Sequence, residues 1–123
     1  MSLNVELLQR VKAHILEEPR RLEMYTWIDA APEHPDAPPC GAVACIAGWT
    51  CILAGDPEPI STRRRAMDLL GLDFLHSEVL FFVDHWPADL ARKHKAAWTN
   101  EARAAAAAER IDRFIAEHGE QGS

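Results

Sequence analysis

The stretch Cys40–Gly55, which reads CGAVACIAGWTCILAG, is the longest apolar run in the chain. A helix that is apolar all round is buried on every side, whereas a surface helix has one polar face. The alanines and glycines of the run would let neighbouring helices pack closely against it. Gly55 at its end is typical of a helix C-cap. We therefore expect a buried central helix at about residues 41–54.

Helical patterns flank this run on both sides. Between residues 4 and 18, apolar residues recur at helical spacing, and Pro19 ends the pattern. Further segments begin at a capping residue or a proline and have an apolar stripe: 62–70, 73–82, 88–97 and 100–118. The last one contains an alanine run, Ala104–Ala108, and alanine is the strongest helix former. Together the segments predict an all-α domain, compact and orthogonal, of roughly five to seven helices.

Two segments are irregular. Residues 20–28 fit two interpretations, because Met24 and Ile28 are one helical turn apart while apolar residues also alternate there as in a strand. A short helix is favoured, and a strand stays open. Residues 29–39 are rich in proline and predict a stiff loop. Because each flank of this loop is too short to fold alone, we expect one domain over residues 1–123.

The composition is that of a globular, acidic protein. Hydrophobic residues make up 48% and charged residues 26%, and the formal net charge is −6. An acidic surface argues against nucleic acid as the main partner, because binding it requires clustered Lys and Arg that neutralise phosphates. The basic run Arg63–Arg65 spreads around a helix, so a solvated surface is favoured there over an anion site.

The chain has no pattern that predicts export or membrane insertion. Polar side chains interrupt its first residues, so no signal peptide is expected. No apolar run approaches the roughly 20 residues that span a bilayer, so we expect no membrane partner. The 3 cysteines are an odd number for a disulfide framework. We therefore expect free thiols and a cytoplasmic protein.

The cysteines do not fit a metal site or a disulfide. On one helix, Cys45 and Cys51 would lie about 120° apart around the axis and about 9 Å apart along it. That geometry suits neither a shared zinc ion nor an S–S bond, so both are expected in the core. Cys40 is a weak candidate nucleophile, because a helix N-terminus lowers the pKa of a thiol. A small residue filling space beneath the proline-rich loop is the favoured interpretation of Cys40.

Asp84 and His85 form the other weak candidate site, since an Asp–His couple can act as a general base. Adjacent residues rarely orient each other in that way, so capping of the next turn is favoured. His76 could lie near an apolar face. Other histidines have polar neighbours on predicted helices and are expected at the surface: His14, His94 and His118.

The 4 tryptophans are many for this length. Tryptophans bury large areas and dominate both cores and interfaces. Trp49 lies in the apolar run and is expected in the core. Trp27 and Trp86 stand beside breaks in the helical patterns, so either could line a groove, although a core position is favoured for both.

Four short motifs in the chain resemble those of a loose group of small bacterial and phage proteins without a known activity. They are the segment Cys40–Trp49, the triplet Leu70-Gly71-Leu72, the pair Phe81-Phe82 and the pair Trp86-Pro87. The resemblance covers roughly Pro19 to Ile115. It implies a single compact helical domain and transfers no activity, cofactor or site residue.

The sequence leaves open three functions. The leading hypothesis is a non-enzymatic interaction or accessory module, with an unknown protein partner or with self-association through the exposed side of the alanine-rich helix. The second is a small-molecule-binding protein or an enzyme with a pocket near Cys40, where His34, His76 or His85 would lie nearby. The third is a metal-binding regulator. No phosphate loop, dinucleotide fingerprint or zinc-protease motif is present, and no cofactor is expected.

Overall fold

In the computed structural model, which describes residues 3–29 and 43–119, the apolar run is divided between a strand and a helix. Val43–Ala44 forms strand β2, and helix α2 spans Ile46–Leu53. Between them, Cys45 has an extended backbone and caps the helix, accepting the Gly48 N–H with its Sγ atom at 3.5 Å. The expectation of a helix at about 41–54 is therefore wrong at its start, although the helix itself is buried as expected.

The described residues contain six α-helices, which confirms the all-α prediction. They are α1 (Val5–Glu17), α2, α3 (Thr62–Leu70), α4 (Phe74–Phe81), α5 (Ala88–Lys95) and α6 (Asn100–His118). Two 3-10 turns, η1 (Pro19–Arg21) and η2 (Val83–His85), lie between them. No helix within residues 3–29 and 43–119 is both long and apolar enough to cross a lipid bilayer.

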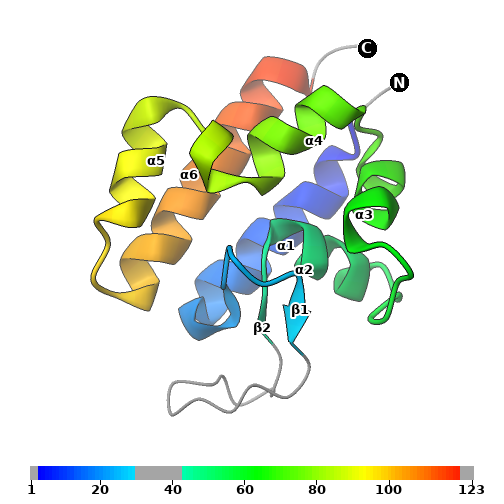
Figure 1. Ribbon diagram of the computed structural model, residues 1–123, viewed down its shortest axis with the longest axis horizontal. Helices are drawn as coiled ribbons and strands as arrows, with labels where there is room; N and C mark the ends of the chain where they lie inside the picture. Colours follow the sequence, from blue (N-terminus) through cyan, green and yellow to red (C-terminus); the bar gives the residue numbers. More distant parts are fainter. Residues whose placement is uncertain (1–2, 30–42, 120–123) are drawn as a thin grey trace.

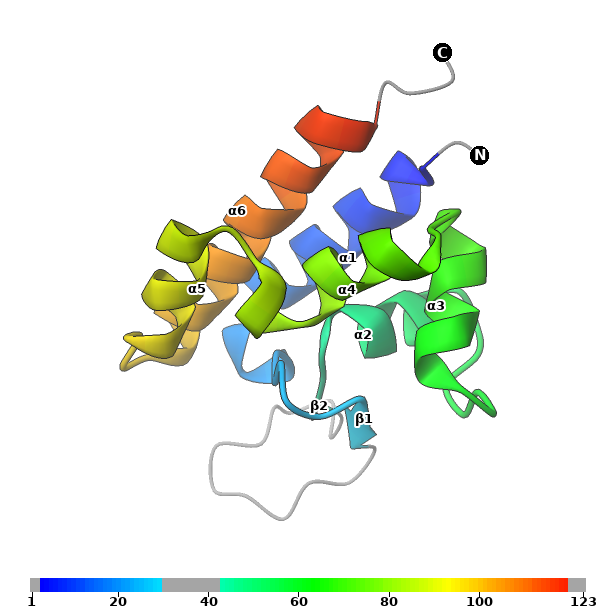
Figure 2. The ribbon, with the colours of Figure 1, turned by 45° about the horizontal axis from the view of Figure 1, so that its top comes forward.

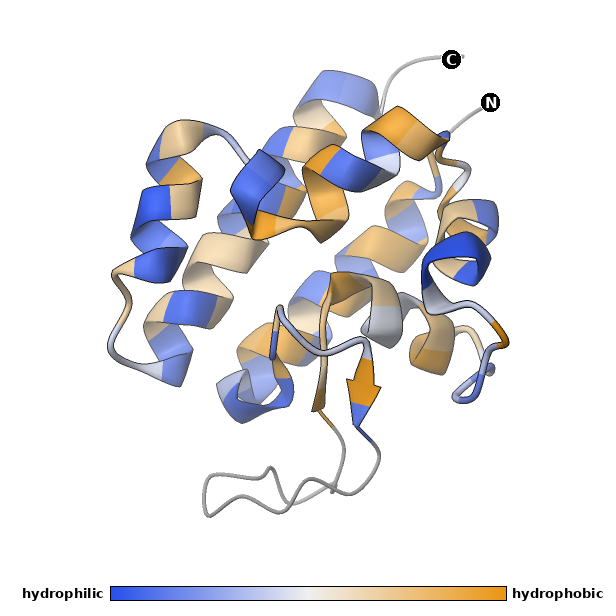
Figure 3. Ribbon diagram, viewed as in Figure 1, coloured by the Kyte–Doolittle hydropathy of each residue, from blue (hydrophilic) through white to orange (hydrophobic). Residues whose placement is uncertain are grey.

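The helices surround a single hydrophobic core. The first and last helices, α1 and α6, lie side by side, and α5 packs on α6 (Figures 1 and 2). On the other side of the core, α2 packs against both α1 and α3, and α4 contacts α2, α3 and α6. Orange apolar segments line the inner sides of the helices, while polar segments lie mostly outside (Figure 3). The largest side chains buried completely in this core are Phe81 and Phe114.

Helix boundaries follow the capping residues of the sequence. Asn4, Ser61, Asp73 and Thr99 each accept a backbone N–H of the first turn with a side-chain oxygen. Gly71 ends α3 with φ +76°, a left-handed conformation that only glycine adopts without strain. This turn sends the chain directly into α4, so that Asp73 and the first turn of α4 lie beside the end of α3.

The segment between α1 and α2 combines both predicted conformations. After η1, the chain makes a turn at residues 24–25, in which the Thr26 N–H donates to the Glu23 carbonyl at 3.3 Å, and then reaches strand β1 (Ile28–Asp29), which pairs antiparallel with β2. The Cys45 N–H also donates to the Thr26 carbonyl at 2.9 Å. Of the short helix expected at residues 20–28, only the end of η1 is formed, and of the alternative strand only Ile28 lies in β1. The predicted proline-rich loop begins in β1 at Asp29, and its remaining residues lie outside the described part of the chain.

The alanine run of α6 allows close helix packing. Four of its members are buried: Ala104, Ala106, Ala107 and Ala108. Arg113 and Lys12 add ion pairs at the edges of this packing, since Arg113 binds Asp89 on α5 and Lys12 binds Asp112 at 2.8 Å. The small side chains are therefore used within the molecule, between α6 and its neighbours.

Candidate functional site

The described cysteines are buried thiols. Burial raises the pKa of Cys45 and of Cys51 to about 11, so both are protonated near neutral pH. The Cys51 Sγ donates to the Thr62 carbonyl at 3.6 Å. Both cysteines are free and buried, as expected for core residues. Cys40, the weak candidate nucleophile, lies outside the described residues.

Asp84 and His85 both lie exposed in η2. The Asp84 carboxylate accepts a hydrogen bond from Lys95, and this bond lowers the pKa of Asp84. Their predicted capping role is wrong, because α5 begins after Pro87 and has no side-chain cap. A catalytic role of the pair stays a prediction. In the described parts of the chain, no group of three or more His, Cys, Asp or Glu residues could hold a metal ion.

His94 corrects the expectation of a surface histidine. Only 4% of the residue is exposed, and neither ring nitrogen has a hydrogen-bond partner among residues 3–29 and 43–119. The ring lies between Trp86, at a centroid distance of 5.4 Å, and Tyr25, at 6.2 Å. An imidazole in such a site is disfavoured in its charged form, and burial accordingly lowers the pKa of His94 below 6.5.

We expect the protein to lose stability as the pH falls below about 6.5, the ordinary histidine pKa. Burial lowers the pKa of His94, and also those of His14 and His118, so the unfolded chain binds protons that the folded chain does not. The free energy of unfolding therefore decreases as the pH is lowered through about 6.5, until the histidines of the folded protein also become protonated. The urea midpoint, measured between about pH 7.5 and about pH 5, checks this.

The urea midpoint of the His94→Leu variant should change less with pH over this range than that of the wild type. The midpoint of His85→Gln, a change at an exposed site, should change as in the wild type. Carboxylates with a lowered pKa, such as Asp73 and Asp89, become protonated only below this pH range and therefore do not contribute to the change in the urea midpoint. A midpoint that is constant over the whole range would contradict the role of the buried histidines.

Aromatic side chains gather on one exposed surface. Trp27, which is 40% exposed, meets Phe82 edge-to-face at 5.7 Å. The Arg63 guanidinium then joins Phe82 to Phe74, lying 5.0 Å and 3.9 Å from the two ring centroids. Tyr25 is 69% exposed and lines a pocket of about 180 Å³ with Trp27 and Phe82. We call Tyr25, Trp27, Arg63, Phe74 and Phe82 the aromatic surface.

The backbone beneath the aromatic surface is held firmly. The Glu23 N–H donates to the Ala44 carbonyl at 3.0 Å, and the Cys45 N–H donates to Thr26, so the segment that holds Tyr25 and Trp27 is tied to β2. Phe82 is the C-cap of α4. Arg63, expected to be solvated, is half-buried and also donates to Ser77 Oγ at 3.0 Å. The groove alternative therefore holds for Trp27, whereas Trp49 and Trp86 are core residues, 3% and 4% exposed.

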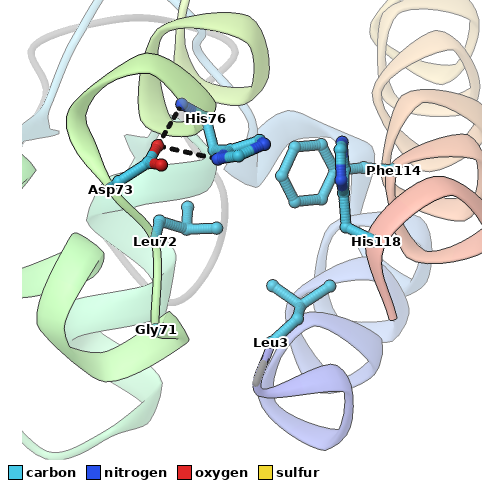
Figure 4. A pocket seen from close by; sticks show the side chains of 7 residues that line it. All are labelled: Leu3, Gly71, Leu72, Asp73, His76, Phe114 and His118. Atoms are coloured by element: carbon cyan, nitrogen blue, oxygen red, sulfur yellow. Dashed lines mark hydrogen bonds and ion pairs between the residues drawn. The ribbon is translucent and has the colours of Figure 1, made fainter. Parts of the chain in front are cut away.

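A second site lies between the start of α4 and the end of α6 (Figure 4). Here a pocket of about 250 Å³ is lined by Leu3, Gly71, Leu72, Asp73, His76, Phe114 and His118. Figure 4 shows the rings of His76, Phe114 and His118 gathered on one side and Leu72 and Leu3 on another. We call it the histidine pocket.

Asp73 fixes the orientation of His76. One carboxylate oxygen, Oδ1, accepts the backbone N–H of His76 at 2.8 Å and lies 2.7 Å from its Nδ1. The hydrogen bond from the His76 backbone is the main cause of the lowered pKa of Asp73, which is therefore ionised near neutral pH. The spacing of three residues in the first helical turn was the sequence signal for this pair. The helical pattern predicts Asp73 only as a cap and His76 only as a residue near an apolar face.

His118 bounds the other side of the pocket on α6, and Arg110 lies beyond it, with its guanidinium 5.4 Å from the ring centroid of Phe114. The His118 ring lies 4.6 Å from the His76 ring and 4.5 Å from the Phe114 ring, between centroids. Burial, followed by the charges of His76 and Arg110, lowers the pKa of His118. Arg110 is 2% exposed and donates from Nε to the Val79 carbonyl at 3.1 Å. The histidine pocket thus combines one carboxylate with two imidazoles, and it is separate from Asp84 and His85.

Comparisons with known proteins give no relative for this chain. No protein-family model, no curated protein and no solved structure matches it.

Proposed function

We propose that this domain is a non-enzymatic interaction module, which binds a segment of a partner protein on the aromatic surface. The observation that supports this function most is the continuous contact from Trp27 through Phe82 and Arg63 to Phe74, on side chains that solvent reaches. A large aromatic group left half-exposed on a firmly held backbone loses little conformational freedom on binding. Tryptophan, tyrosine and arginine are also the residues that dominate binding energies at protein interfaces.

The charge of the chain favours a basic partner segment with an apolar anchor. The net charge of −6 attracts a cationic segment and repels a second copy or a nucleic acid. Glu23 is exposed beside Tyr25 and accepts its backbone N–H at 3.1 Å. A Lys or Arg of the partner would meet this carboxylate and stack on the ring of Tyr25, because Arg63 already occupies the rings of Phe74 and Phe82. An apolar side chain would fill the pocket beside Trp27.

Selection from a random peptide library displayed on phage tests which partner the surface prefers. The whole protein serves as bait, and the Trp27→Ser variant serves for counter-selection. We expect the enriched peptides to combine Lys or Arg with Leu, Met or an aromatic residue. Enrichment of acidic peptides, or of peptides that bind the variant equally well, would contradict the proposal.

For a peptide enriched in this way, Trp27→Ser is expected to weaken binding about 30-fold, because truncating a central interface tryptophan costs about 2 kcal/mol. The matched control is Trp98→Ser, since Trp98 is 95% exposed and lies outside the aromatic surface. Isothermal titration calorimetry gives both dissociation constants. Equal losses for the two variants would show that the peptide prefers any exposed tryptophan, and the aromatic surface would lose its support.

Self-association through the exposed side of α6 is the alternative assembly. The exposed Ala102 and Ala105 leave room there for a neighbouring helix, although the acidic net charge opposes it. Sedimentation velocity at increasing protein concentration distinguishes a dimer from a monomer.

We further propose that this is a bacterial, cytoplasmic protein. Its motifs Cys40–Trp49 and Trp86-Pro87 resemble those of the group of small bacterial and phage proteins. The free thiols of Cys45 and Cys51 agree with a reducing compartment.

A further inference from the structure

We propose that the histidine pocket binds a small neutral molecule of the phenol class, an apolar ring with one hydroxyl group, whose hydroxyl donates a hydrogen bond to Nε2 of His76. This site is separate from the aromatic surface and does not depend on the function proposed for it. The residues that build it come from distant parts of the chain: the N-terminal segment, the turn between α3 and α4, and the end of α6.

The hydrogen-bond acceptor is defined by Asp73. Because the Asp73 carboxylate lies 2.7 Å from Nδ1 of His76, a neutral His76 holds its proton on that nitrogen. Its Nε2 is then an acceptor, and the ring extends from Asp73 towards the side of the pocket where Phe114 and His118 lie (Figure 4). A ligand that satisfies Nε2 must therefore offer an O–H or N–H group.

A nitrogen of His118 favours a ligand with a hydroxyl group. The Nδ1 atom of His118 is buried and has no hydrogen-bond partner among the described residues. Buried polar atoms in folded proteins are nearly always hydrogen-bonded, so a ligand atom that pairs with this nitrogen relieves an unfavourable state. Nε2 of His118 lies 3.6 Å from the Glu117 carboxylate. When His118 holds a proton on Nδ1, a hydroxyl oxygen can accept from that nitrogen while the hydroxyl hydrogen is donated to His76, which a simple N–H group cannot do.

The size and the walls of the pocket favour one aromatic ring. Its volume of about 250 Å³ lies below the range of roughly 300–1,000 Å³ that drug-sized ligands occupy. Leu3 and Leu72 offer apolar contact, and the ring of Phe114 offers an aromatic edge or face. A single substituted ring fills such a space, whereas a nucleotide or a peptide exceeds it.

Electrostatics favour a neutral ligand. A carboxylate or phosphate would meet the ionised Asp73 in the same pocket, and the N-terminus of α4 is already capped by that side chain. A cation would be opposed by the positive charge of Arg110, which does not line the pocket but lies near enough to lower the pKa of His118. Ions of either sign are therefore disfavoured, while the dipole of a hydroxyl group suits both imidazoles.

Amide NMR spectra of the whole protein, titrated with phenol, test the site. Toluene is the matched probe, because it keeps the ring and lacks the hydroxyl. We expect phenol to shift the amide signals of Leu72, His76 and Phe114 and to bind about tenfold more tightly than toluene, the worth of one hydrogen bond. Zinc chloride is titrated separately, since two imidazoles also suit a transition metal.

Two variants identify the acceptor. His76→Phe should bind phenol no better than toluene, whereas His85→Phe, at an exposed site outside the pocket, should keep the preference. Asp73→Asn keeps the helix cap, because asparagine caps about as well as aspartate, but it no longer holds the Nδ1 proton by charge. The ratio of phenol affinity to toluene affinity should fall severalfold in this variant. The variant therefore tests the site independently of whether His76→Phe folds.

The inference is overturned by equal binding of phenol and toluene, by an unchanged preference in both His76→Phe and Asp73→Asn, or by the absence of phenol binding. Zinc binding at His76 and His118 without phenol binding would instead identify the pair as a metal site and would also overturn it.

Discussion

Replacing Gly48 by alanine is expected to lower the free energy of unfolding by about 3 kcal/mol, the upper end of the usual cost of overpacking a core. A Cβ atom at this position would overlap the backbone carbonyl of Trp27 and lie 2.7 Å from the Cβ of Ala44. The backbone atom cannot rotate away, so strand β1 or helix α2 must shift. Alanine is favoured over glycine in a helix by about 1 kcal/mol, which is too little to offset the overlap.

Gly55→Ala is the matched control for this result. Gly55 has φ +92°, but a Cβ atom there would meet nothing within 4 Å. Only backbone strain opposes alanine, at a cost of about 1 kcal/mol. Urea unfolding followed by circular dichroism gives both values. If Gly48→Ala were no less stable than Gly55→Ala, the close approach between α2 and the Trp27 backbone would be refuted.

The shift of β1 or α2 that Gly48→Ala requires should also displace Trp27 and weaken peptide binding.

Trp86→Ala is expected to cost about 3–5 kcal/mol, as the loss of a large buried aromatic side chain does. Trp86 is 4% exposed, its Nε1–H donates to the Leu80 carbonyl at 2.8 Å, and its ring contacts His94. Because a domain of this size is stable by only about 5–15 kcal/mol, the variant should lose a large part of its stability and unfold at a clearly lower temperature than the wild type. Thermal unfolding followed by circular dichroism measures the effect.

Two comparisons separate the contributions of Trp86. Trp86→Phe keeps most of the ring and loses the hydrogen bond, so about 1–3 kcal/mol is expected. Trp98→Ala removes a tryptophan that is 95% exposed, and its effect should stay within about 0.5 kcal/mol. Similar losses for Trp86→Ala and Trp98→Ala would be incompatible with a core position for Trp86.

Helix positions could be predicted where a capping residue and an apolar stripe agree, as at Asp73 and Thr99. The start of α2 could not, because an apolar run has the same composition in a buried strand and in a buried helix. The change at Cys45 is decided by its hydrogen bond to Thr26, a residue far away in the sequence. The small size of Gly48 was visible, but the sequence did not show that a strand carbonyl would lie against it.

The sites were less predictable than the helices. Trp27 and Phe82 are distant in sequence, and only the tertiary structure brings their rings together. His94 has basic neighbours in the sequence, yet Lys93 and Lys95 lie on other sides of α5 and say little about the face that His94 occupies. The Asp73–His76 pair could have been found, since its spacing places both side chains on one helical turn.

The pairing of α1 with α6 has a consequence for synthesis of the protein. The two helices pack along each other, although they stand at opposite ends of the described chain (Figure 2). The ribosome makes α1 first, so the apolar side of this helix, which includes Leu8 and Val11, is covered only in part, by α2 and its neighbours, until α6 has emerged. Folding is therefore expected to finish only after translation of α6, and until then the nascent chain presents a natural binding site for chaperones.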